Sequence, residues 1–167
     1  DKAVYAYAAE DTRWWEKQIG RPLEHGVFGE NLTTEGIDVN GALVGERWEI
    51  GSTLLEVSEP RIPCWRLGVR MNDDRFLRRF TEEMRPGAYL RIVSEGDLAA
   101  GDQVRVVERP ATDLTVRDVF RIYTRDRQEA GRLIANPGMS EAWKRWAADF
   151  LRKAGSGEPS SHKVGCC

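Results

Sequence analysis

The change of pattern at Arg109-Pro110-Ala111 constrains the fold of this chain more than any other feature of the sequence. Before it, short alternating segments typical of strands are separated by glycine turns and interrupted by helical segments. After it, each segment has the spacing of an amphipathic helix. The regular strand–helix alternation of a doubly wound sheet is missing. We therefore predict a β-rich α+β fold, an antiparallel or mixed sheet closing toward a barrel over residues 1–110. A trihelical annex over 111–154 and a disordered tail over 155–167 are expected to follow.

Local patterns place individual elements within these parts. Residues 47–50 alternate between charged and apolar side chains, and Gly51-Ser52 has the length of a two-residue hairpin turn. In the annex, Thr115 is expected to cap the first helix, Asp126 to open the second and Ser140 to cap the third. The predicted elements before the annex are a helix over 8–19, a strand at 31–34, a hairpin within 42–58, a helix over 73–84, and strands over 89–93 and 103–107.

The charge balance argues against a nucleic-acid partner. The chain carries 25 basic and 27 acidic residues, a net charge of -2 at pH 7. A three-helix unit could bind DNA, but no helix of the annex has a basic outer face without balancing carboxylates. Neither an apolar run of ~18 residues nor a signal peptide is present, so we expect a cytoplasmic protein without a membrane partner. The sequence starts at Asp1, without Met and within a structured-looking segment, so we also expect a preceding segment.

Three cysteines are too few for a disulfide framework or for a four-cysteine iron–sulfur cluster of the chain's own. No CxxC and no pair of histidines at ligand spacing is present, so neither zinc nor haem is expected. His25 is expected to be an exposed loop residue, which leaves Cys64 without the partner of a Cys–His hydrolase. Cys166 and Cys167 end the tail, where lipidation would lack an adjacent polybasic run. Cys64 is therefore the cysteine in a structured context.

Cys64 follows two prolines. Because proline fixes φ and lacks an N–H group, Pro60 and Pro63 are expected to hold the thiol in an irregular, extended segment rather than in a helix. The nearby Arg61 and Arg66 favour the thiolate, the form that attacks electrophiles or binds soft metals. A buried structural cysteine is the alternative, and the residues alone leave both interpretations open.

The second candidate site is the glycine-punctuated loop over residues 26–31. Glycines allow the backbone to approach an anion closely, and the N–H groups of the loop could bind one. The loop does not match G-x-G-x-x-G and opens no convincing helix, so an ordinary turn is the alternative interpretation.

Several stretches together resemble the MOSC domain family, named for the C-terminal part of molybdenum cofactor sulfurases. The annex segments are similar to the three-helix extension of the YiiM-type branch of that family. In the family, a His-Gly-Gly segment and one or more opening strands precede the position of Asp1, so the resemblance implies that N-terminal strands of the barrel are missing from this sequence. The stretches are DKAVYAY at 1–7, FGENLTTEG at 28–36, PRIPCWRL at 60–67, TVRDVFR at 115–121 and residues 133–143.

The resemblance implies a MOSC-type β-barrel, closed or partly open, that binds a molybdenum–molybdopterin cofactor. Cys64 would bind the metal, since a thiolate is a soft donor. Gly29 and Asn31 would lie in the loop that holds the cofactor. Lys2 and Arg61 would bind the phosphate of the pterin.

The implied activity is that of a detoxifying oxidoreductase. It would remove oxygen reductively from N-hydroxylated bases, such as hydroxylaminopurines, or from amidoxime-like compounds. Glu30 would orient ligands or deliver a proton to the departing hydroxyl, with a purely structural role as the alternative. Because no cluster or flavin motif is visible, the electrons would come from an external flavoprotein or ferredoxin-type reductase.

Two other functions stay open. In the first, the same fold carries sulfur on Cys64 as a persulfide for delivery to a metal cofactor, a role proposed for MOSC domains in general. In the second, the chain is a non-enzymatic binding module in which Cys64 is structural.

Overall fold

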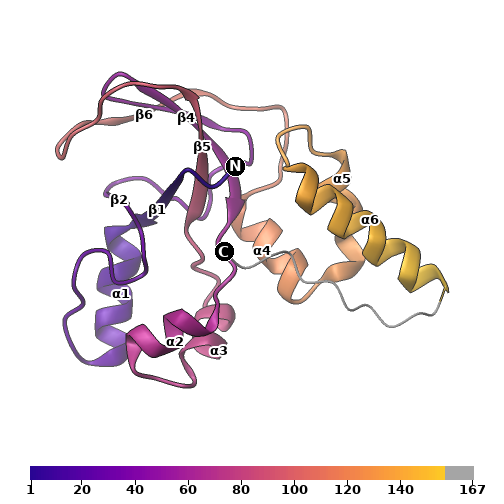
Figure 1. Ribbon diagram of the computed structural model, residues 1–167, viewed down its shortest axis with the longest axis horizontal. Helices are drawn as coiled ribbons and strands as arrows, with labels where there is room; N and C mark the ends of the chain where they lie inside the picture. The colour runs from indigo at the N-terminus through magenta and orange to yellow at the C-terminus, as the bar shows by residue number, and fades with distance from the viewer. Residues whose placement is uncertain (157–167) are drawn as a thin grey trace.

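One mixed sheet of six strands curls into a half-barrel in the computed structural model, which describes residues 1–156 (Figure 1). The strands are β1 (Val4–Ala8), β2 (Leu32–Thr34), β3 (Arg47–Ile50), β4 (Thr53–Pro60), β5 (Ala88–Ser94) and β6 (Val104–Glu108). Their order is β2-β1-β5-β4-β3-β6, so β2 and β6 form the two edges. β1 and β2 are parallel, and the other neighbouring pairs are antiparallel. The predicted β-rich fold is confirmed, with an open gap between the edges.

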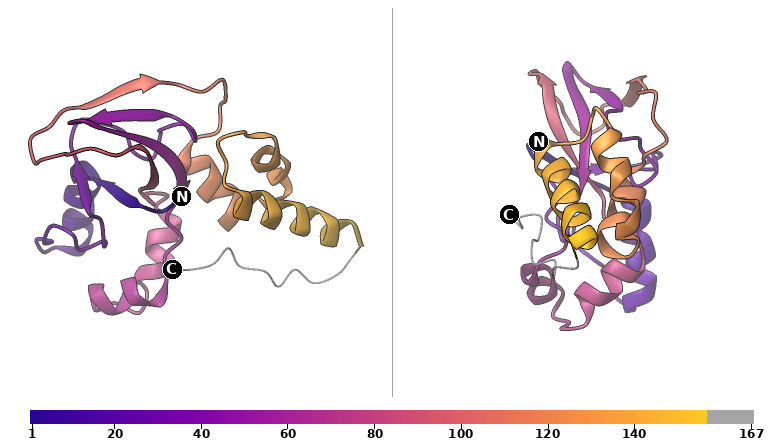
Figure 2. Two further views of the ribbon diagram at one scale, coloured as in Figure 1. Left: turned by 45° about the horizontal axis from the view of Figure 1, so that its top comes forward. Right: turned by 90° about the vertical axis from the view of Figure 1, so that its right-hand side faces the viewer.

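Helices pack beside the sheet and form the C-terminal annex (Figure 2). Gly20 ends the first helix as predicted, in the left-handed conformation at φ 76°. No helix within residues 1–156 is both long enough and apolar enough to cross a bilayer. The helices are α1 (Ala9–Ile19), α2 (Trp65–Met71), α3 (Phe76–Glu82), α4 (Val116–Thr124), α5 (Gly131–Ala135) and α6 (Glu141–Ser156), with a 3₁₀ turn, η1, at Arg127–Glu129.

Alternating side chains give the sheet two apolar faces, and both are buried. Ala6 of β1 packs inside the half-barrel in a cluster that includes Trp48 of β3. Tyr7, its neighbour in β1, points outward and joins a second cluster with Trp15 of α1 and Phe80 of α3. The Trp15 Nε1–H group donates to the Tyr7 hydroxyl at 3.0 Å, which satisfies the indole in this apolar setting.

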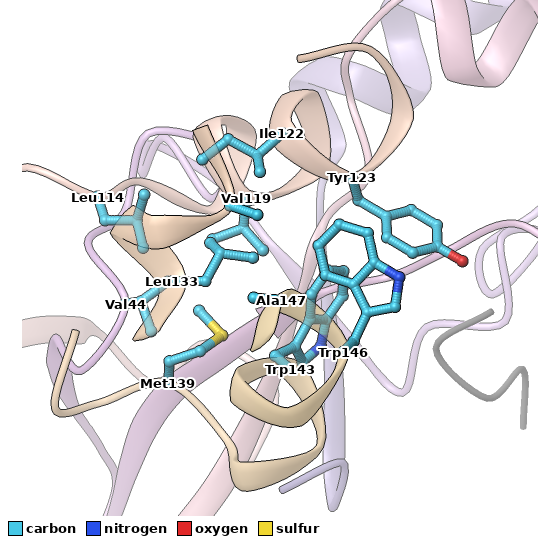
Figure 3. Close-up of a cluster of buried hydrophobic side chains, with 11 residues drawn as sticks. Val44, Leu114, Val119, Ile122, Tyr123, Leu133, Met139, Trp143, Trp146 and Ala147 are labelled. Carbon is cyan, nitrogen blue, oxygen red and sulfur yellow. The ribbon is translucent and has the colours of Figure 1, made fainter. Parts of the chain in front are cut away.

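The annex shares its core with the sheet. A third cluster combines Val119 of α4 with Trp143 of α6 and with Val44, which precedes β3 (Figure 3). The apolar stripe predicted for α4 is confirmed, and it reaches all three clusters: Val116 lies in the inner cluster and Phe120 in the outer one. The second predicted helix of the annex is divided into η1 and α5.

Two segments differ from the sequence-based expectation. No element is predicted from the sequence at residues 65–71, where α2 lies, and a glycine in this segment disfavours a helix interior. Here Gly68 allows close packing, since a Cβ atom added to it would lie 2.7 Å from Leu77 Cδ1 of α3. The helix predicted over 73–84 is limited to α3, and Met84 beyond it adopts φ 54°.

The predicted tail boundary also shifts. α6 continues to Ser156, two residues beyond the expected end of the annex at 154. The remainder of the predicted tail, including Cys166 and Cys167, lies outside the described residues.

We expect Thr115→Ala to lower the free energy of unfolding by about 1 kcal/mol, because a capping box opens α4. Asp118 N–H donates to Thr115 Oγ1 at 3.0 Å, and the Asp118 carboxylate accepts from Thr115 N–H at 3.2 Å. Thr115→Ser keeps the hydroxyl and should lose less than half as much. Urea unfolding measures both variants, and equal losses would contradict the capping role.

An ion cluster joins η1 to its neighbouring helices and makes the annex sensitive to acid. Arg121 and Arg132 donate to the Glu129 carboxylate at 2.7 and 3.0 Å, and these hydrogen bonds lower the pKa of Glu129 from its usual 4.5 to about 2. On acidification the unfolded chain therefore binds the proton first. The stabilisation is present above about pH 4.5 and is lost as the pH falls toward about 2.

Arg121→Gln should therefore lower the melting temperature at neutral pH and flatten its further decline between about pH 4.5 and 2. Circular dichroism melts over this range provide the measurement. Arg152→Gln is the control, because the Arg152 guanidinium lies 3.8 Å from Asp149 on the exposed side of α6 and should leave the acid profile unchanged. An unaltered acid profile in Arg121→Gln would disprove the assignment.

Candidate functional site

Cys64 lies immediately before α2, four residues after the end of β4. Its backbone is extended, with φ -119° and ψ 170°, as expected from Pro60 and Pro63. Its thiol is free and only partly buried. The residue is therefore placed at a surface rather than in an apolar core.

The Cys64 side chain lines a groove of about 530 Å³ between the sheet domain and the annex. Leu77 of α3 lies on one side, and Tyr123 and Arg127 of the annex lie on the other. A larger cavity, of about 710 Å³, opens between the edge strands β2 and β6 and is lined by residues 31–37 and 98–104, with Ile50. We take the smaller groove as the candidate site, because it contains Cys64, the predicted metal ligand.

The glycine loop and the segment before Cys64 meet at Arg61. Gly29 adopts φ 80°, and a Cβ atom added to it would lie 3.1 Å from Arg61 Nη1 and 3.8 Å from Arg70 Nη1. The Arg61 guanidinium covers the ring of Tyr5, with Cζ 4.9 Å from the ring centroid. Glycine suits position 29 for its left-handed backbone, and any side chain there would push the Arg61 guanidinium outward by a few tenths of an ångström.

Asn31 and Glu30 hold the loop in place. Asn31 Oδ1 accepts from Tyr5 N–H at 2.7 Å, and Asn31 N–H donates to the Tyr5 carbonyl at 3.1 Å. Glu30 is only 9% exposed, and its Oε1 accepts from Gly26 N–H at 2.8 Å. Its buried Oε2 has no hydrogen-bond partner among the described residues. Glu30 therefore supports the loop, and its role in proton transfer stays a prediction.

Two tyrosines on neighbouring strands support two cations. Tyr5 of β1 and Tyr89 of β5 are paired across the strands, with ring centroids 5.1 Å apart. Arg61 lies over Tyr5, and Lys2 Nζ lies 5.5 Å from the centroid of Tyr89. Burial raises the pKa of Tyr5 well above its usual value, so its hydroxyl stays neutral and donates to the Pro86 carbonyl at 2.7 Å. The two rings therefore hold the side chains of Arg61 and Lys2 in place, and the neutral Tyr5 hydroxyl adds no negative charge beside them.

Glu59, which the sequence does not single out, connects this cation pair to the annex. It is 3% exposed, and its Oε1 lies 3.2 Å from Lys2 Nζ. Its Oε2 accepts from the Ser140 hydroxyl, directly before α6, at 3.1 Å. A register shift between Val57 and Glu59 marks a bulge at Ser58, and such bulges re-aim the side chains that follow. The carboxylate is fully paired although it is buried.

The structure brings most of the predicted site residues together, whereas Cys64 lines a groove that includes none of the others. Gly29, Glu30, Asn31 and Arg61 gather around Tyr5, Lys2 joins through Tyr89, and Cys64 follows Arg61 by three residues. His25 is an exposed loop residue, as expected. Within residues 1–156, no group of three His, Cys, Asp or Glu side chains could hold a metal ion. The sequence did not indicate that Tyr5, Tyr89, Glu59 and Arg70 belong to the site. The one local pattern that pointed to any of them was the Tyr-x-Tyr alternation of β1.

The family follows from a match of the MOSC domain model to residues 1–105. The chain belongs to the MOSC domain family. The structure of YiiM from Geobacillus stearothermophilus superimposes on this MOSC domain protein with a TM-score of 0.85 and 29% identity, covering 90% of this chain and 78% of that one. YiiM from Escherichia coli gives a TM-score of 0.82 at 24% identity, over 96% of this chain and 81% of that one, which supports the fold.

The chain is also similar in sequence to three named bacterial and fungal proteins, of which one is named for an activity. The chain is 29% identical over 156 residues to the uncharacterized protein YflK of Bacillus subtilis, covering 92% of this chain and 69% of YflK. It is 26% identical over 151 residues to protein YiiM of Escherichia coli, covering 87% and 67%. A Gibberella moniliformis protein named reductase is 36% identical over 128 residues. That match covers 73% of this chain but only 22% of the reductase.

Gly29→Ala should weaken anion binding at the loop by roughly fivefold, equivalent to about 1 kcal/mol, because the added methyl group displaces Arg61. Gly20→Ala is a matched control: Gly20 has φ 76°, close to the 80° of Gly29, but no atom lies within 4 Å of an added Cβ. Both variants should lose similar stability, about 1 to 2 kcal/mol, from the left-handed backbone. Calorimetric titration with inorganic pyrophosphate compares them, and equal affinities would contradict an anion site at Gly29.

Proposed function

We propose that this MOSC domain protein binds a molybdenum–molybdopterin cofactor and reduces N-hydroxylated bases or related N-hydroxylated compounds. The observation that carries the proposal is the partly exposed thiol of Cys64, which lines a groove. Three residues earlier in the chain, the Arg61 guanidinium lies over the ring of Tyr5. Membership of the MOSC family and the name of the reductase relative support an oxidoreductase function.

The residues present fit a phosphate-bearing pterin and its metal. The guanidinium groups of Arg61 and Arg70 both lie on the side of Gly29 where a side chain would project. Neither arginine forms an ion pair within residues 1–156. Planar guanidinium groups of this kind bind phosphate in a bidentate manner. Glu30 Oε2 is buried without a hydrogen-bond partner within residues 1–156, so it is available to contact a ligand. The Cys64 thiolate is a soft metal ligand.

Each side chain has a defined task in the proposed reaction. The N–O bond of a substrate R–NH–OH breaks, and two electrons with two protons convert it to R–NH2 and water. When bound, the cofactor supplies the two-electron redox chemistry. Cys64 would hold the metal at the groove, and Arg61 and Lys2 would neutralise the phosphate. Glu30 is the proposed source of a proton for the departing hydroxyl.

The proposed electron donor is a separate flavoprotein or ferredoxin-type protein, and the proposed compartment is the cytoplasm. The sequence carries no flavin or cluster motif of its own.

Freshly isolated protein should contain about one molybdenum and one pterin per chain, and Cys64→Ser should lose the metal because a serine hydroxyl is a poor ligand for it. Elemental analysis, pterin fluorescence and turnover of a hydroxylaminopurine are the measurements. Cys166→Ser with Cys167→Ser is the matched control, since it removes the other two thiols of the chain and should leave the metal in place.

The same experiment separates the alternatives. Metal-free protein with a labile sulfur on Cys64 would instead assign the chain as a persulfide carrier. Unchanged cofactor content and activity in Cys64→Ser would contradict the proposal and favour a binding module. Full turnover with NADPH alone would contradict the external donor.

A further inference from the structure

The exposed side of α2 combines apolar and cationic side chains directly beside Cys64. Trp65 and Val69 are 68% and 69% exposed, the highest values among the large apolar residues described. Arg66 and Arg70 are exposed on the same side of the helix, because these positions are one turn apart. The four residues define what we name the α2 face. The opposite side of α2 is buried through Leu67, Gly68 and Met71.

The α2 face lies in a strongly basic segment of an acidic chain. Residues 61–80 contain six arginines and two aspartates, a net charge of +4, whereas the whole chain has a net charge of -2. On α3 and its preceding loop the charges are paired, Arg78 with Glu82 and Arg79 with Asp73. Arg66 and Arg70 form no ion pair with any residue of the described range 1–156. Of the two, Arg66 is not assigned to the phosphate, and its Cζ lies 5.8 Å from the ring centroid of the exposed Trp65. A cation beside an exposed tryptophan matches an acidic protein surface.

We propose that the α2 face is the docking site for the electron donor, a ferredoxin-type protein with carboxylates around its cluster. This inference rests on the proposed function and names the surface and the charge of its partner. Trp65 follows Cys64 directly, and Val69 lies one turn further, about 6 Å along the helix. A donor seated there would bring the edge of its cluster close to the metal ligand. Transient electron-transfer contacts are small, and a seven-residue helix is sufficient for one.

The position of α2 leaves its exposed face accessible to a donor protein beside the groove. α2 lies at the end of the molecule opposite β6 (Figure 1). The groove lined by Cys64 also includes Trp65 and Arg66. The α2 face therefore begins at the rim of the groove and continues outward, so a donor and a small substrate can be bound at the same time.

Charge substitutions at Val69 test the inference, since its side chain is exposed and is not assigned to cofactor binding. With a reduced, acidic [2Fe–2S] ferredoxin as donor, Val69→Glu should lower kcat/KM for the donor by about tenfold through electrostatic repulsion. Val69→Lys removes the same apolar surface but keeps the positive field, so it should lose at most about twofold. Ile134→Glu, at an apolar residue of α5 that is 43% exposed, is the matched control and should change nothing. For the unmodified protein the rate should fall as salt rises.

Reduced methyl viologen, a small donor that needs no docking surface, separates this inference from the proposed function. All variants should turn over hydroxylaminopurine with viologen at rates within about twofold of the unmodified protein. Normal viologen rates with equal effects of Val69→Glu and Val69→Lys on the ferredoxin rate would overturn the docking site. No turnover with viologen by the unmodified holo-protein would overturn the proposed function and this inference with it. A dimer in sedimentation that Val69→Glu dissociates would assign the α2 face to a second copy and would also overturn the inference.

Discussion

The burial of α4 is the constraint on which the rest of the structure depends. A helix of nine residues with one apolar stripe usually packs against a single core. Here Val116, Val119 and Phe120 enter three different clusters, because α4 lies where the annex meets both sides of the sheet. Backbone bonds reinforce this position, since Val116 N–H donates to the Ala42 carbonyl at 2.9 Å. The annex is therefore fixed to the sheet by the same helix that fills part of the sheet's own core.

The candidate site depends on strand pairing. Tyr5, Tyr89 and Glu59 form one row across β1, β5 and β4, because Tyr89 is paired with each of the others. A row across a sheet brings together residues that are far apart in the sequence and holds them at fixed spacing. The cations Arg61 and Lys2 then rest on this row. The positive charge of the site is thus placed by backbone hydrogen bonds in the sheet as much as by local loop conformation.

The predictable features are those whose signal is local. The β3–β4 hairpin, α1 and α4 could be predicted, since period and caps lie within each segment. α2 could not be predicted, because Gly68 disfavours a helix locally. The reason for a glycine at this position is the close packing against α3, which the local sequence does not show. In the site, the family resemblance indicated Cys64 and Arg61. Glu59 could not be found in this way, since its position depends on the bulge in β4 and on a partner in the annex.

The bond between Ser140 and Glu59 affects how the roles of the two parts can be separated. Cutting the chain at the boundary near 110 would leave Glu59, which is 3% exposed, with Lys2 as its one remaining partner within the described part of the chain. Leaving an oxygen of a buried carboxylate without its hydrogen bond is destabilising, and it would also loosen the carboxylate that positions the Lys2 ammonium group. The cut would in addition uncover Val44. Deleting the annex is therefore not a neutral dissection: a truncated protein that loses activity has been altered in its sheet domain as well as in its helices.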